Sequence, residues 1–184
     1  MIAHNRRRPQ ARVLITAALS LPLLWGACGG GGGEEDGGEP CALSPSDRYP
    51  AKVIDSRATG DENENTDPAA AQGAPDCAAG QPNDLALGKG HVIFDLGCPM
   101  ESHPGPEIRV WESDGSYCQA IAESYEVFFS EDNSAYTRVG EGFGVSEFDA
   151  GAMARFRFIK ITAARGIEGG SSPGPDIDAI EVLF

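Results

Sequence analysis

Short runs of alternating apolar and polar residues, separated by clusters of Gly, Pro, Asn, Asp and Ser, make up the chain from residue 51 onward. A period of two sends successive side chains to opposite faces of a strand, and no run has the longer period of a useful amphipathic helix. About eight short strands without helices predict an all-β fold, a sandwich of antiparallel strands. The predicted strands are Ala51 to Ser56, His91 to Leu96, Glu107 to Glu112, Glu123 to Ser130, Ala135 to Val139, Ser146 to Asp149, Phe156 to Thr162 and Ile177 to Phe184.

The longest run of alternation indicates one face of the core. Tyr125, Val127 and Phe129 share one face of their strand, so we expect that face to be buried. Asp132-Asn133 then ends the strand. This pair predicts a tight turn, in which Asn takes a positive φ.

Alternation slips by one residue in the strand predicted at Phe156 to Thr162. Phe156 and Phe158 fall on one parity, whereas Ile159 and Ile161 fall on the other. This slip predicts either a β-bulge or burial on both faces.

A turn-to-strand motif occurs twice, at Pro104 to Glu112 and at Pro173 to Glu181. Each copy is Pro-Gly-Pro followed by an acid, an Ile and a later Glu. Pro-Gly-Pro is incompatible with a helix and favours an extended entry into the strand. An acid, Glu107 or Asp176, therefore begins each strand. If both beginnings lie at the same end of one sandwich, the two carboxylates could share a cation.

The N-terminus has the pattern of an export signal. Four arginines precede an apolar run from Val13 to Leu24, which is too short to span a bilayer comfortably. Leu23-Leu24-Trp25-Gly26-Ala27-Cys28 resembles a bacterial lipobox, which implies cleavage before a lipid-modified Cys28. We therefore expect residues 1–27 to be a lipoprotein signal peptide. The exported protein would be lipid-anchored in the cell envelope, at the outer membrane or the cell surface.

The remaining chain divides into a tether and one domain. Residues 28–40, rich in Gly and Glu, can bury nothing and are expected to be flexible, whereas residues 41–184 are enough for a single core. Removal of the signal takes away four arginines and lowers the formal net charge from -14 to -18. So acidic a surface argues against nucleic acid as a partner.

Four cysteines remain in the domain: Cys41, Cys77, Cys98 and Cys118. An even number without a C-x-x-C pair, and with only His91 and His103 to complete a metal site, predicts two disulfides rather than zinc. Three pairings are possible, and the sequence does not choose among them. Proximity along the chain favours Cys41 with Cys77 and Cys98 with Cys118.

Several segments carry a family resemblance when they are taken as an ordered set. They are Gly73 to Asp76, Leu87 to Gly97 followed by the first Pro-Gly-Pro strand, Phe129 to Tyr136, Phe158 to Ile161 and Asp176 to Ile180. This set resembles the galactose-binding-like, discoidin-type jelly-roll domains of bacterial cell-surface proteins, from about Ala51 to Phe184. The resemblance implies a jelly-roll β-sandwich that binds a sugar or another surface ligand. It also implies a structural calcium beneath the N- and C-terminal strands.

Five acids are candidate calcium ligands, because calcium prefers six to eight hard oxygen ligands. Asp176 and Asp178 are two residues apart and would share a face of a regular strand, where their repulsion favours a cation or Arg109 between them. The alternative is that all five are solvated acids at strand ends. The candidates are Asp76, Glu107, Asp176, Asp178 and Glu181.

Two other motifs match their patterns only in part. Asp61 to Asp67 has the spacing of an EF-hand loop, but Thr66 and Gln72 stand where Gly and Glu are needed, which favours a solvated loop. Gly170 to Gly174 matches the G-x-S-x-G string of hydrolases around Ser172, but a Pro and no helix follows. With no recognisable catalytic group, we expect that the protein is not an enzyme.

Sugar binding needs an aromatic platform beside polar groups. Trp111, the single Trp of the mature domain, and Tyr117, in the loop after it, are the candidate ligand-binding residues. The sequence thus predicts an exported, lipid-anchored module that binds carbohydrate or another surface ligand with support from calcium. The alternative is a structural or adhesion protein that contacts other surface proteins and binds no small molecule.

Overall fold

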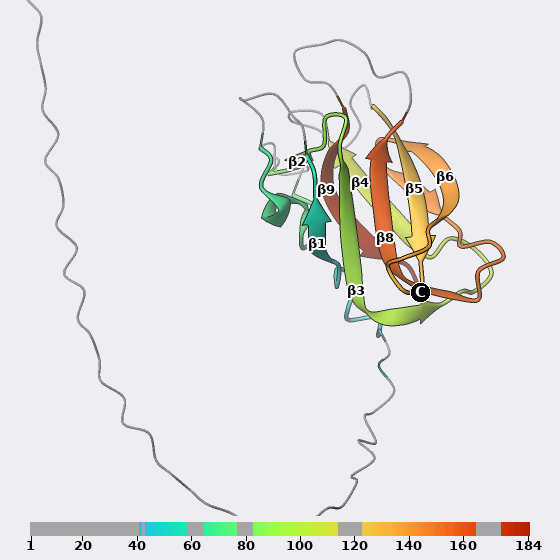
Figure 1. Cartoon of the computed structure of the whole chain (residues 1–184). Coiled ribbons are helices and arrows are strands. Elements are labelled where there is room, and N and C mark those ends of the chain that lie inside the picture. Colours follow the sequence, from blue (N-terminus) through green and yellow to red (C-terminus); the bar gives the residue numbers. More distant parts are fainter. Residues whose placement is uncertain (1–40, 42, 59–64, 77–82, 114–122, 165–173) are drawn as a thin grey trace, which may run out of the picture. The chain divides into compact units, whose positions relative to one another are not determined.

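The structure is a computed structural model of the chain, and it describes residues 41, 43–58, 65–76, 83–113, 123–164 and 174–184 (Figure 1). The chain divides into two units, Met1–Gly37 and Gly38–Phe184. The first unit lies outside the described residues, as do the predicted signal peptide, Cys28 and the tether. All the described structure belongs to the second unit.

Two antiparallel β-sheets enclose the core of this unit (Figure 1). The strand order is β1-β3-β8-β5-β6 in the five-stranded sheet and β2-β9-β4-β7 in the four-stranded sheet. The first sheet consists of β1 (Lys52–Ser56), β3 (His91–Glu101), β8 (Arg155–Ala163), β5 (Ser124–Ser130) and β6 (Thr137–Phe143). The second consists of β2 (Leu85–Ala86), β9 (Asp176–Val182), β4 (Ile108–Ser113) and β7 (Ser146–Phe148). A short 3-10 helix, η1 (Pro68–Ala71), lies between β1 and β2 along the chain.

All eight predicted strands are present, so the prediction of an all-β sandwich is confirmed. Three strands differ in extent by more than one residue: β3 continues past Leu96, β6 begins at Thr137 and reaches Phe143, and β9 ends at Val182. The sequence did not predict β2, because two residues are too few to show alternation. It did not predict η1 either, where the side chain of Asp67 caps the helix by accepting a hydrogen bond from Ala69 N (2.9 Å).

The core lies between the two sheets and contains the predicted face of β5. Tyr125, Val127 and Phe129 are fully buried, as predicted. Phe129 stacks on Phe156 of β8 with ring centroids 4.1 Å apart, and Ile177 of β9 joins the same cluster from the other sheet. Burial of each such side chain contributes about 1.5–3 kcal/mol. The alternating apolar residues therefore account for how the two sheets hold together.

The slip of alternation predicted near Phe158 corresponds to a bulge in the pairing of β3 with β8. Asp95 pairs with Phe158, but the next pair joins Met100 to Phe156. Five steps along β3 thus face two steps along β8, so β3 contains three extra residues. Across the bulge the buried residues of β8 change parity, from Phe156 to Ile159 and Ile161, and the last residues of β3 are redirected.

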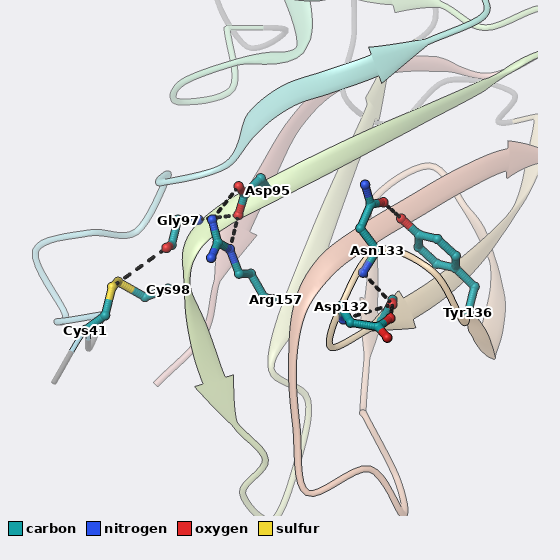
Figure 2. A network of polar contacts seen from close by, with 9 residues as sticks. Cys41, Asp95, Gly97, Cys98, Asp132, Asn133, Tyr136 and Arg157 are labelled. Carbon is teal, nitrogen blue, oxygen red and sulfur yellow. Dashed lines mark hydrogen bonds and ion pairs between the residues drawn. A yellow bond between two sulfur atoms is a disulfide. The ribbon is translucent and has the colours of Figure 1, made fainter.

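A single carboxylate braces this bulge. Asp95 accepts hydrogen bonds from Arg157 Nε (2.6 Å) and a terminal guanidinium nitrogen of Arg157 (2.8 Å), and from Gly97 N (2.8 Å) (Figure 2). The hydrogen bond from Arg157 lowers the pKa of Asp95 below its ordinary value. Asp95 therefore joins the bulged strand to its neighbour β8.

The loop between β5 and β6 has the predicted turn chemistry. Asn133 has a φ of 63°, which is the only positive φ at a non-glycine residue among those described. Ser130 Oγ accepts from the backbone N–H groups of Asp132 (3.3 Å) and Asn133 (3.1 Å). The hydrogen bond from the Ser134 hydroxyl lowers the pKa of Asp132 to about 2. Tyr136 completes the loop by donating its hydroxyl to Asn133 Oδ1 (Figure 2).

Cys41 forms a disulfide with Cys98, with the two Cα atoms 5.4 Å apart (Figure 2). The pairing favoured by proximity is therefore wrong for both of these cysteines. The reason is that β3 continues beyond its predicted end and brings Cys98 to the beginning of the domain, across a sequence separation of 57 residues. Cys77 and Cys118 lie outside the described residues.

Candidate functional site

The two Pro-Gly-Pro strands are β4 and β9, which are antiparallel neighbours in the four-stranded sheet. Ile108 pairs with Val182 at one end of the pair, and Ser113 pairs with Asp176 at the other. Glu107 and Asp176 therefore lie at opposite ends, roughly 20 Å apart for six extended residues. The condition for a cation shared by these two acids, that both strands begin at the same end, is not met.

The two copies of the motif nevertheless share a turn conformation, because Gly105 and Gly174 both have a φ of 107°. At Gly174 a Cβ would also lie 2.0 Å from the carbonyl oxygen of Gly88, so only glycine fits there. Gly105 has open space around the corresponding position. The first turn therefore needs glycine for its φ alone.

Glu107 is completely buried before the start of β4. Its Oε1 accepts hydrogen bonds from Ser102 Oγ (2.8 Å) and His103 N (3.0 Å), and its Oε2 accepts from Ala150 N (2.7 Å). A buried carboxylate needs such partners, and both oxygens of Glu107 have protein donors. The side chain therefore fixes the turn that contains His103 against the segment that follows β7.

Glu181 of β9 is also buried, under a group of basic and aromatic side chains. It accepts hydrogen bonds from Arg48, from Arg109 (2.9 Å) and from the indole N–H of Trp111 (3.1 Å). The Arg109 guanidinium lies 5.8 Å from the Trp111 ring centroid and also binds Glu147. Arg109 thus pairs with Glu181 and Glu147 rather than standing between Asp176 and Asp178.

The remaining candidate calcium ligands lie near the beginning of β9. Both carboxylate oxygens of Asp178 accept from Asp76 N (3.1 and 3.3 Å), and Asp76 Oδ1 accepts from Asn83 N (3.0 Å). Asp178 is an extra residue of β9, because Asp176 to Ile177 and Ala179 onward pair with β4 across a register shift. Within the described ranges no group of three or more His, Cys, Asp or Glu is arranged to hold a metal ion.

Calcium support remains a prediction, and the structure shows which of the five candidate acids already bind protein donors. The carboxylates of the two buried glutamates, Glu107 and Glu181, are already occupied by protein donors. Asp178 and Asp76 also accept from backbone N–H groups, so Asp76, Asp176 and Asp178 keep the calcium prediction without a preformed site among the described residues.

The two predicted ligand-binding aromatics have different outcomes. Trp111 lies on the face of β4 opposite the buried Val110, half-buried, with its indole N–H bonded to Glu181. Tyr117 lies outside the described residues, as does Ser172. Whether either aromatic binds a ligand stays a prediction.

An open hollow of about 350 Å³ lies where β3 ends and β8 begins. Its lining includes the polar side chains Glu101, His103 and Arg155 and the apolar side chain of Leu43. Phe184, also in the lining, is 56% exposed, as one of three exposed large apolar residues among those described. The hollow lined by Glu101, His103, Arg155 and Phe184 is called the end hollow below.

Two polar groups of the end hollow come from paired strands. Glu101, the last residue of β3, pairs with Arg155, the first residue of β8. Arg155 Nε also donates to Glu131 Oε1 (2.5 Å), which lies in the loop after β5. The bulge in β3 is what brings Glu101 into register with Arg155.

The other two groups are held by the end of the chain. His103 Nε2 lies 3.3 Å from the carbonyl oxygen of Leu183, and Leu183 N donates to the carbonyl oxygen of Glu107 (2.8 Å). The residue after Leu183 is Phe184, so these two contacts fix the segment that presents its ring. The backbone of His103 is in turn held by the buried side chain of Glu107.

Sequence reasoning did not single out Glu101, Arg155 or Phe184, and it considered His103 only as a possible aid to a metal site. No motif joins these residues, because they come from two strands, a turn and the end of the chain. Phe184 had no signal in the sequence either, because the predicted last strand includes Phe184, whereas β9 ends at Val182 and leaves Phe184 outside the sheet.

Comparison with known proteins finds similar three-dimensional structures but no match to a family model or a curated sequence. CBM32-1 from a family 31 glycoside hydrolase of Clostridium perfringens is 13% identical with a TM-score of 0.50, over 77% of this chain and 100% of that one. The family 32 carbohydrate-binding module of EndoD from Streptococcus pneumoniae is 12% identical with a TM-score of 0.50, over 72% and 94%. The C-terminal domain of a chitobiase from Bacteroides fragilis is 15% identical with a TM-score of 0.39, over 51% and 62%.

The first two similarities establish the fold. The domain is a jelly-roll β-sandwich with the fold of these two modules, which is the fold that the sequence resemblance implied. The chain spans the whole or nearly the whole of these two modules but only 62% of the chitobiase domain. Among the described residues, no helix has the length and apolar character needed to cross a bilayer.

Proposed function

We infer that the domain is a carbohydrate-binding module and that it binds sugar in the end hollow. The observation that carries this proposal is the exposed ring of Phe184 beside Glu101, His103 and Arg155. A sugar ring has an apolar C–H face and a rim of hydroxyl groups, so it binds where an aromatic face adjoins hydrogen-bonding side chains. The end hollow combines both kinds of group.

The polar groups are suited to hydroxyls rather than to a charged ligand. A carboxylate accepts hydrogen bonds, a guanidinium donates them, and an imidazole does either. Arg155 is paired with Glu131 and stands opposite Glu101, so the basic charge in the hollow is balanced. The similar solved structures support this proposal, because two of them are carbohydrate-binding modules of family 32.

The proposal also places the module outside the cell, attached through lipid on Cys28. Its support is the signal-like N-terminus and the lipobox resemblance. A Gly-rich tether of the length of residues 28–40 spans roughly 20 Å root-mean-square, enough to hold the domain clear of lipid headgroups. Calcium would stabilise the folded domain and would not contact the sugar, since its candidate ligands lie near the beginning of β9 and outside the end hollow.

Glycan-array screening of the mature protein, with and without calcium, tests the binding proposal. Isothermal titration with the best binder should then show that Phe184→Ala and Arg155→Ala each weaken binding at least about tenfold, since about 1.4 kcal/mol is lost with each contact. Phe143→Ala and Arg138→Ala are matched controls, because Phe143 is 59% exposed and the Arg138 side chain 47% exposed, away from the hollow. A wild-type protein that binds no glycan would overturn the proposal and favour contact with another surface protein.

A further inference from the structure

A second hollow, of about 300 Å³, lies beside the end of the chain. Pro45, Arg48, Val182 and Leu183 line it, together with Phe184. It is called the side hollow below. Phe184 therefore lines both the end hollow and the side hollow.

One segment of backbone contributes to both hollows. Cys41 and Leu43 line the end hollow, and Pro45 and Arg48 line the side hollow. The disulfide to Cys98 fixes the first residue of this segment. The carbonyl oxygen of Arg48, which accepts from Val182 N (2.7 Å), fixes the last. Because both ends of the segment are held, the two hollows are preorganised side by side.

The polar chemistry of the side hollow repeats that of the end hollow. Arg48 has a side chain that is 55% exposed, and one terminal nitrogen of its guanidinium donates to the buried Glu181. A guanidinium carries five N–H donors, so donors remain for a ligand. Each hollow thus contains an arginine that pairs with a glutamate, Arg155 with Glu131 and Arg48 with Glu181, which also binds Arg109. The acidic protein as a whole also repels polyanions.

We propose that the end hollow and the side hollow are adjoining subsites for one neutral glycan of at least two sugar units, with Phe184 contacting both units. This rests on the proposed function, because it assumes that the end hollow binds sugar. The volumes are each near the lower limit of ligand pockets, roughly 300 Å³, so each suits one sugar ring and neither suits a longer chain. A disaccharide therefore gains contacts that its terminal monosaccharide lacks.

Titration calorimetry with three probes tests the proposal: the best neutral binder from the glycan array, that glycan shortened to a disaccharide, and its terminal monosaccharide. Wild-type protein should bind the disaccharide at least about tenfold more tightly than the monosaccharide. Pro45→Trp fills the side hollow from an exposed position. It should lower disaccharide affinity to that of the monosaccharide and leave monosaccharide affinity unchanged. Ser46→Trp, at an exposed neighbour outside both linings, is the matched control.

Arg48→Lys is a second variant, which keeps a positive charge beside Glu181 but loses the planar fork of donors. It should weaken the disaccharide several-fold and leave the monosaccharide unaffected. Equal affinity of wild-type protein for disaccharide and monosaccharide, with no effect of Pro45→Trp, would overturn the two-subsite proposal while leaving sugar binding intact. An Arg155→Ala variant that binds glycan as tightly as the wild-type protein would overturn the proposed function as well. A wild-type protein that binds no neutral glycan would also overturn it. Melting temperatures of the variants exclude unfolding as the cause.

Discussion

The buried carboxylate of Glu107 accepts a hydrogen bond from the backbone N–H of His103, with 3.0 Å between the two atoms. Glu107 also accepts from Ala150 N through its other oxygen, and its carbonyl accepts from Leu183 N. Three segments therefore meet at Glu107, and two of them, the turn with His103 and the segment of Leu183, lead into the lining of the end hollow. The sequence suggested Glu107 as a calcium ligand, but in the structure it organises the turn and the chain end beside the hollow.

Replacement of Glu107 tests this organising role. Glu107→Gln keeps the shape but puts an NH₂ group among N–H and O–H donors, which should cost about 1–3 kcal/mol of unfolding free energy. Urea denaturation measures the loss, and glycan affinity should fall with it because His103 and Leu183 lose their anchor. Glu147→Gln is the control, because its exposed pairing with Arg109 is worth about 0–1 kcal/mol. Equal effects of the two substitutions would contradict the role of Glu107.

The bulge in β3 should make stability sensitive to acid. Arg157 lowers the pKa of Asp95 below its ordinary value, so the ionised form is favoured by folding. This contribution is complete above the ordinary pKa, near pH 4, and is lost as the pH falls through the lowered value. Denaturation between pH 7 and pH 2 should therefore show a smaller acid-dependent loss in Asp95→Asn than in the wild-type protein. Arg157→Gln should remove the same part of the pH dependence, and unchanged profiles in both variants would argue against the interaction.

The disulfide framework can be read directly by non-reducing peptide mapping. We expect a Cys41–Cys98 peptide and, since two bridges are predicted for four cysteines, a second peptide that joins Cys77 to Cys118. Replacing both Cys41 and Cys98 by Ser should lower the unfolding free energy by about 2–5 kcal/mol. A peptide that joins Cys41 to Cys77 would contradict the structure.

Calcium binding remains to be tested at the beginning of β9. If Asp76, Asp176 and Asp178 hold calcium, the ion stabilises only the folded protein, by about 2.7 kcal/mol at a hundredfold excess over the dissociation constant. Calorimetric melts in EDTA and in millimolar calcium should then differ for the wild-type protein and differ less for Asp178→Asn. A wild-type melt that is indifferent to calcium would leave these acids as structural and surface charges.

The proposed lipid anchor depends on one cysteine, Cys28. Wild-type protein should partition into the detergent phase and incorporate labelled fatty acid in a bacterial host, because the lipobox resemblance implies a lipid on Cys28. Cys28→Ala should do neither. Equal partitioning of the two proteins would refute the anchor while leaving the sugar-binding proposal untouched.

The sequence by itself determined the elements of this protein, because strands depend on local patterns. Alternation located eight of the described strands and the buried face of Tyr125, Val127 and Phe129. The slip near Phe158 indicated the bulge, and Asn133 indicated the turn with positive φ. Each of these depends on residues only a few positions apart, whose backbone preferences and side-chain directions are fixed by covalent geometry.

Only the tertiary structure decided how distant elements meet. The antiparallel pairing of β4 with β9 separates Glu107 from Asp176, and the bulged end of β3 joins Cys98 to Cys41 rather than to its neighbour in sequence. The end hollow likewise gathers Phe184 with residues more than eighty positions away, such as Glu101. Such meetings follow from the order and register of strands in two packed sheets. That order is set by the combined packing of the whole core, which no local spacing in the chain encodes.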